Sequence, residues 1–234
     1  MAAQPNQIPT DQSVKAAIKA LLAEKGLKDL VGLYFDGMPQ TDFAGHLFDT
    51  IPDNPPERVV ASDLVAVSLL DVSFGPMATD ALLNRAYLDS HLAVEKLPIN
   101  LDLWDAIDRV NNLYAARKVL DDLHDVGPVK ASKLLARKRP RLVPITDRHV
   151  EVFFGCRGWE FLTPLATCLS ENSDLVGAIN ALSPSPSESG HSPTTLRLLD
   201  VAIWMTRSRS ASAKKARKAA LGDSRALDLR SSDR

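Results

Sequence analysis

Residues 119–152 read VLDDLHDVGPVKASKLLARKRPRLVPITDRHVEV and contain two helical patterns separated by a short turn. The first pattern ends at Leu123, and the residues at 124–128 interrupt it. Pro128 suits the first turn of a second helix, where its missing N–H costs nothing. Gly127 can adopt backbone angles that residues with a side chain avoid. We therefore predict two antiparallel helices within residues 110–137, joined by a turn at 124–128.

The second of these helices combines an apolar face with a basic one. Residues 130–141 contain six lysines and arginines and no acidic residue. The N-terminus of a helix presents free backbone N–H groups that can bind a phosphate. We predict that DNA phosphates contact the backbone amides of the turn and the basic side chains after it, namely Val126, Gly127, Val129, Lys130, Lys133 and Arg137.

This segment resembles part of the helix–hairpin–helix DNA glycosylase superfamily, in particular its endonuclease III branch. In that family a Leu-Pro-Gly-Val-Gly hairpin leads into a helix with a small alanine, and an extended link reaches the catalytic Asp of Val-Asp-Thr-His. Here Leu123-His-Asp-Val-Gly127 matches the hairpin, Ala131 the alanine and Thr146-Asp147-Arg148-His149 the catalytic step. The match covers about 34 of 234 residues. The ARKRPRLVP segment is also compatible with an uncharacterised bacterial family that carries this element.

The resemblance implies a monofunctional base-excision glycosylase in which Asp147 is catalytic. Such an enzyme flips a base out of the duplex, and a carboxylate stabilises the positive charge that develops on the sugar or activates water. An Asp before a helical run is also a favoured N-cap, worth about 1 kcal/mol. The two roles are compatible, and we expect His149 to support the start of the helix.

Three departures from the family pattern restrict the expected chemistry. Val129 stands where bifunctional members carry a Schiff-base lysine, so lyase activity is not expected. Asp125 replaces the first hairpin glycine and places a carboxylate where a phosphate should approach. Cys156 and Cys168 are too few for an iron–sulfur cluster or a four-cysteine zinc site. We expect neither a metal nor another cofactor.

Helical patterns cover most of the remaining chain, and only residues 142–145 look extended. We predict an all-α, multi-helix globular domain over residues 11–207, between a flexible N-terminus at 1–10 and a basic, flexible tail at 208–234. Three aromatic residues could line a base pocket, although each also suits the core: Tyr87, Trp104 and Trp204.

The net charge of −1 is unevenly distributed. Residues 207–234 contain nine Lys or Arg against three Asp, which favours a polyanionic partner such as DNA. We expect such binding to be electrostatic and independent of sequence, with contributions from residues 207–218. The sequence contains no secretory signal and no apolar run of about 18 residues, so we expect a cytoplasmic protein without a membrane segment. The alternative is a non-catalytic helical protein in which the hairpin is structural or binds a protein partner.

Overall fold

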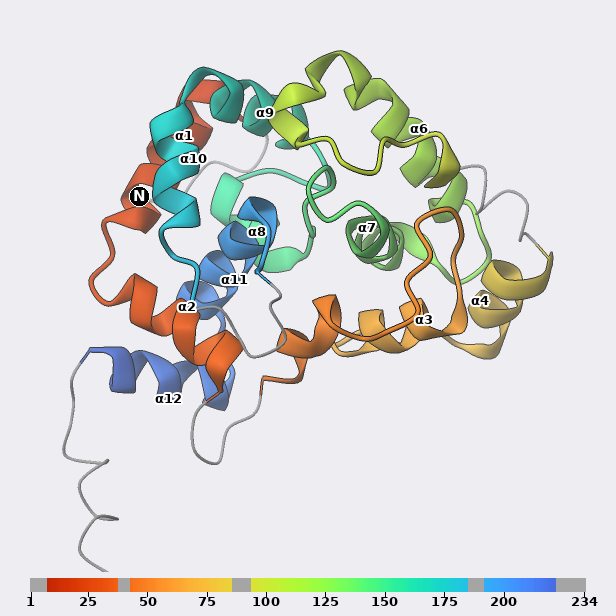
Figure 1. Ribbon diagram of the computed structural model, residues 1–234, viewed down its shortest axis with the longest axis horizontal. Helices are drawn as coiled ribbons and strands as arrows, with labels where there is room; N and C mark the ends of the chain where they lie inside the picture. The colour runs from red at the N-terminus through yellow and green to blue at the C-terminus, as the bar shows by residue number, and fades with distance from the viewer. Residues whose placement is uncertain (1–7, 38–42, 86–93, 185–191, 222–234) are drawn as a thin grey trace, which may run out of the picture.

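The computed structural model describes residues 8–37, 43–85, 94–184 and 192–221, and every regular element in these ranges is helical (Figure 1). The predicted all-α, multi-helix fold is confirmed. No helix in the described ranges is long and apolar enough to cross a membrane. The α-helices are α1 (Asp11–Leu22), α2 (Leu27–Asp36), α3 (Ala61–Ser68), α4 (Pro76–Asp80), α6 (Val110–Asp121), α7 (Gly127–Lys138), α8 (Arg148–Phe154), α9 (Leu162–Glu171), α10 (Ser173–Asn180), α11 (Thr195–Arg207) and α12 (Ala211–Ala220).

Shorter helical turns fill several of the connections. Three of them are 3-10 turns that precede α3 or α6, and one π-helical turn extends α4. They are η1 (Ala44–Asp49), η2 (Ala81–Arg85), η3 (Leu103–Asp105) and η4 (Ile107–Arg109).

The helices form two neighbouring groups (Figure 1). The N-terminal helices α1 and α2 lie with α8 to α12, and α11 contacts α2, α8, α10 and α12. The central part of the chain supplies the other group, in which α7 contacts both α3 and α6. Residues 143–147 belong to no regular element and connect α7 in the central group to α8 in the terminal group. A side chain on this connection is therefore close to both groups.

The two helices predicted within residues 110–137 are present as α6 and α7, which pack against each other. The chain reverses between them through left-handed backbone angles, with φ of 60° at Asp125 and 66° at Gly127. Pro128 lies in the first turn of α7, as expected. The identification of this pair as a DNA-binding helix–hairpin–helix element remains a prediction.

Part of the segment predicted to be a basic tail is helical. Residues 211–220 form α12, whose Ala213 and Ala216 are buried against the terminal group. The alternation of Ser, Ala, Lys and Arg that suggested a tail places alanines on one face of a helix and cations on the others. The predicted flexible N-terminus lies mostly outside the described residues, as does the chain after Leu221.

Gly127 provides a test of the turn, because its φ is positive and an added Cβ would meet no atom within 4 Å. We expect Gly127→Ala to lower the free energy of unfolding by about 1 kcal/mol, through backbone strain alone. Gly177 in α10 has equally open surroundings and no positive φ. Gly177→Ala should therefore raise stability by about 0.5–1 kcal/mol. Urea unfolding measures both changes, and equal effects of the two substitutions would contradict the turn geometry.

Candidate functional site

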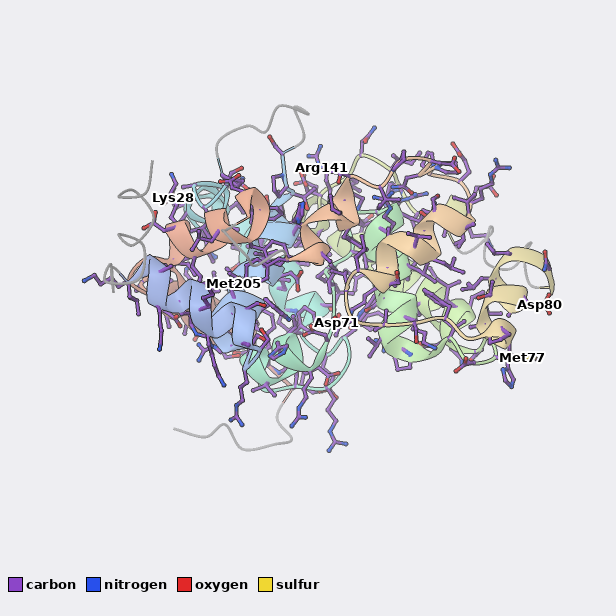
Figure 2. The ribbon with its side chains drawn as sticks, turned by 90° about the horizontal axis from the view of Figure 1, so that it is seen from below. Lys28, Asp71, Met77, Asp80, Arg141 and Met205 are labelled. Carbon is purple, nitrogen blue, oxygen red and sulfur yellow. The ribbon has the colours of Figure 1, made fainter. Side chains whose placement is uncertain are left out.

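A cavity of about 320 Å³ lies where the two groups of helices meet. Its wall combines residues from α2, α7 and α11 with residues from four other segments. These are residues 43–45 at the start of η1, residues 69–71 after α3, residues 145–147 before α8 and residues 210–212 at the start of α12. Asp71, which is labelled in Figure 2, lies between the two groups in that view. The polar side chains among the lining residues are Tyr34, Asp71, Lys133, Asp147, Arg197, Asp200, Ser210 and Ser212, and the aromatic ones also include Phe43 and Trp204.

Asp147 lines this cavity and also caps α8. Its Oδ1 accepts hydrogen bonds from the backbone N–H groups of His149 (2.8 Å) and Val150 (3.1 Å). These two bonds fix the carboxylate at the end of the connection 143–147. The expected capping role is thus present, and the same carboxylate faces a cavity. The amides of Val126, Gly127 and Val129 are not part of the cavity wall.

Lys133 provides a cation in the cavity wall and is almost completely buried, at 4 % exposure. Its Nζ donates a hydrogen bond of 2.6 Å to the carbonyl oxygen of Leu70, across to the segment after α3. Burial lowers the pKa of Lys133, while the nearby carboxylates, Asp147 first among them, act in the opposite direction. A lysine in such surroundings is less firmly protonated than an exposed one and can hold or transfer a proton.

Arg197 and Asp200 form a buried charge network at the base of the cavity. Arg197 bonds Asp49 at 2.9 Å and the Tyr34 hydroxyl at 2.9 Å, and it also donates to the Gly45 carbonyl at 2.7 Å. Another guanidinium nitrogen pairs with Asp200. Burial raises the pKa of Asp200 to about 7, although Arg197 acts against this rise. The Arg197 guanidinium is therefore occupied by protein groups.

Aromatic rings form one side of the cavity. Tyr34 and Phe43 stack with their centroids 5.4 Å apart, and Trp204 meets Phe43 edge-on at 5.9 Å. The His149 ring lies 6.5 Å from Trp204. Of the aromatic residues expected to line a pocket, Trp204 lies in this wall, Trp104 packs against the core, and Tyr87 lies outside the described residues.

The prediction that Arg137 contacts phosphate is corrected by its burial. Its guanidinium donates to the carbonyl oxygens of Phe48 (2.6 Å) and Ile51, and its Nε is 3.6 Å from Asp63. Lys133 is buried as well, so neither cation is on the surface. Both side chains are held by partners from distant segments, which local sequence does not reveal.

Polar groups of the turn at 124–128 are also bonded to nearby residues of the protein. Lys130 donates a 2.7 Å bond to the Asp125 carbonyl and lies 3.5 Å from the Asp125 carboxylate. The Val126 amide donates to the Leu123 carbonyl at 3.1 Å, while Val129 is 41 % exposed. The sequence suggested that Asp125 would repel a phosphate, and the structure places Lys130 beside that charge.

Residues 27–207 match the model of a family described as a family of unknown function, DUF6308. The chain belongs to the DUF6308 family. No curated protein and no solved structure matches the chain. The region shared with the DUF6308 family contains every residue of the cavity wall except Ser210 and Ser212.

Sequence reasoning missed Arg197 and Asp200, although a signal for them exists. They lie three residues apart within the otherwise apolar run Leu196–Met205 of α11. Side chains at this spacing are neighbours on a helix, and charges on a buried face must be paired. No group of His, Cys, Asp and Glu in the described ranges could hold a metal ion.

Asp200 gives the site a testable pH dependence. Its folded pKa of about 7 exceeds the ordinary value of 3.8, so the folded state holds an extra proton between these values. Wild-type stability should therefore fall as pH rises from 5 to about 8, relative to Asp200→Asn. We expect a change of at least about 1.4 kcal/mol, the equivalent of one pKa unit. Urea unfolding across this range measures the difference, and a constant difference would contradict the assignment.

Proposed function

We propose that the chain is a DNA-binding protein that removes a base as a monofunctional N-glycosylase, with Asp147 as the catalytic carboxylate. One observation carries this proposal: a carboxylate fixed by two backbone N–H groups lies on an aromatic-lined cavity, at the position where the resemblance implies a catalytic Asp. The volume of about 320 Å³ is at the lower end of the range for small-molecule sites, which suits a single flipped base.

The chemistry follows from the position of Asp147. The bond between the base and the sugar carbon breaks, the base leaves with the electron pair, and water adds to the sugar. Positive charge develops on the sugar during this step, and a preorganised carboxylate stabilises it without having to reorient. The same carboxylate can accept a proton from the attacking water. Asp147 takes part in none of the ion pairs found in the described ranges, so no cation neutralises its charge by direct contact.

Lys133 and the aromatic side chains would hold the base. Trp204 and Phe43 offer ring surfaces on which a flipped base can stack. The ammonium group of Lys133 has three donors, one of which reaches the Leu70 carbonyl. The remaining donors suit a carbonyl oxygen or ring nitrogen of the base. Because the lysine is desolvated, its hydrogen bonds are stronger than those of an exposed lysine.

The competing proposal is a non-catalytic protein in which the α6–α7 pair has a structural role or binds a protein. The burial of Arg137 favours it, because α7 then presents fewer cations to DNA than the sequence indicates. The cavity beside Asp147 favours the catalytic proposal, because a purely structural N-cap requires no adjoining cavity.

Asp147→Asn distinguishes the two proposals. Asn keeps the shape and much of the capping bond, so stability should change by well under about 1 kcal/mol. Loss of the charge should reduce base release by at least about a hundredfold while DNA affinity stays equal or rises slightly. The assay uses duplexes that carry uracil, oxidised or alkylated bases, followed by alkali to cleave the abasic sites.

The matched control is Asp102→Asn, which removes a carboxylate that pairs with Arg141 outside the cavity. This variant should retain wild-type base release. Wild-type protein that is inert on every lesion would overturn the glycosylase proposal and leave the non-catalytic one. In that case Asp147→Ala would only lower the melting temperature through the lost cap.

A further inference from the structure

The basic residues of the cluster 130–141 form hydrogen bonds or ion pairs with other groups of the protein. Lys133, Arg137, Lys138 and Arg139 are all at most 4 % exposed, and each donates to a backbone carbonyl of another segment. The two others form ion pairs, Lys130 with Asp125 and Arg141 with Asp102. The cluster 130–141 is therefore not a free cationic surface, and a polyanion must be bound by cations elsewhere.

Exposed cations occur instead on segments that also contribute residues to the cavity wall. Arg148 follows the lining residue Asp147, and Arg209 precedes the lining residue Ser210. Along α12, Lys214 and Lys218 follow Ser210 at intervals of four residues, so the three share one helix face. All four cations are exposed, and we refer to them together as the basic rim: Arg148, Arg209, Lys214 and Lys218.

Contacts between α11 and α12 hold the part of the rim that lies on residues 209–218. Arg217 donates to the carbonyl oxygens of Met205 and Ser208, which joins the two helices at their connection. The Ser210 hydroxyl caps α12 by accepting from the Ala213 amide at 3.1 Å. In Figure 2 the blue helix α12 lies to the left of the lining residue Asp71. Residues 201–222, which contain Arg209, Lys214 and Lys218, include no Asp or Glu.

The cavity wall, in contrast to the basic rim, carries more acidic than basic side chains. Its wall carries three carboxylates, Asp71, Asp147 and Asp200, and its two cations are already bonded to protein groups. A free phosphate would be disfavoured inside. An uncharged aromatic group would fit, because rings and hydrogen-bonding groups surround the space. A partner with phosphates at the basic rim and an uncharged aromatic base in the cavity is complementary to both regions.

We propose that the basic rim binds the backbone phosphates on either side of a nucleotide whose base occupies the cavity. The occupant is a nucleic-acid strand, since only such a polymer combines regular phosphates with bases that can enter the cavity singly. This inference rests on the proposed function in taking nucleic acid as the partner, but it requires no base release. It assigns phosphate binding to α12 and the start of α8, in place of α7.

The test is fluorescence anisotropy with a labelled single-stranded DNA of about 15 nucleotides, titrated at several salt concentrations. Each phosphate contact on a single strand contributes about 0.7 to the slope of log affinity against log salt. The quadruple variant in which each rim residue becomes Gln should lower this slope by about 3 and weaken binding at least tenfold at low salt. The four residues are exposed, so the variant should fold, and its circular dichroism should match wild type.

The control variant replaces four exposed cations of the central part of the chain and causes the same change in net charge. For this control variant, the slope of log affinity against log salt should differ from that of wild type by no more than the contribution of one phosphate contact, about 0.7. Its substitutions are Arg58→Gln, Lys96→Gln, Arg109→Gln and Lys118→Gln. An equal loss in the rim and control variants would overturn the proposal, because it would show a response to net charge alone. Poly-glutamate that binds as tightly as DNA would also overturn it, by showing a surface for acidic chains in general.

The two proposals can fail separately. Wild-type protein that binds DNA through the rim but releases no base would refute the glycosylase proposal and support the rim. Base release with an unchanged salt slope in the rim variant would support the glycosylase proposal and refute the rim.

Discussion

Cations buried at the C-terminal end of α7 hold the central part of the structure together. Arg137 and Lys138 both approach the carboxylate of Asp63 in α3, and Asp63 in turn accepts the Val60 amide at 2.8 Å. Arg139 donates to the carbonyls of Val94 and Leu97. A charge removed from water is costly unless it is paired and hydrogen-bonded, so these side chains require the segments around them to stay in place. Removal of one partner would leave the remaining charge unpaired in the interior.

The same constraint shapes the cavity and the surface around it. Lys133 lies on α7 one turn before Arg137, and its bond to the Leu70 carbonyl connects the cavity wall to the segment after α3. The connection 143–147 leads from this end of α7 to Asp147, which also lines the cavity. The cations of α7 are bonded to other segments of the protein. The exposed cations of the basic rim therefore lie on α8, on α12 and at Arg209 just before α12. The proposed nucleic-acid binding would therefore use basic residues other than those that stabilise the fold.

The sequence predicted features that depend on neighbouring residues. Gly127 and Pro128 locate the turn before α7, and Asp147 is recognisable as an N-cap, because these preferences act over a few residues. The inward direction of Arg137 could not be predicted, since its acceptors, Phe48 and Ile51, lie more than 80 residues away. Similarly, the cavity depends on Lys133 and Asp200 meeting across helices that are far apart in the chain. Lysines and arginines of a helix can be exposed to solvent or bonded inside the protein with the same local sequence. Only the tertiary contacts show which of the two occurs.

In the proposed complex a nucleotide occupies the cavity beside Asp147, and its phosphates lie on α8 and on residues 209–218. Hydrogen exchange of the wild-type chain, with and without a saturating single-stranded oligonucleotide, tests this most directly. Bound nucleotide should slow exchange of the backbone amides at 145–150 and 208–214 and leave those at 110–126 unchanged. Slower exchange confined to the α6–α7 turn at 122–130 would contradict the account.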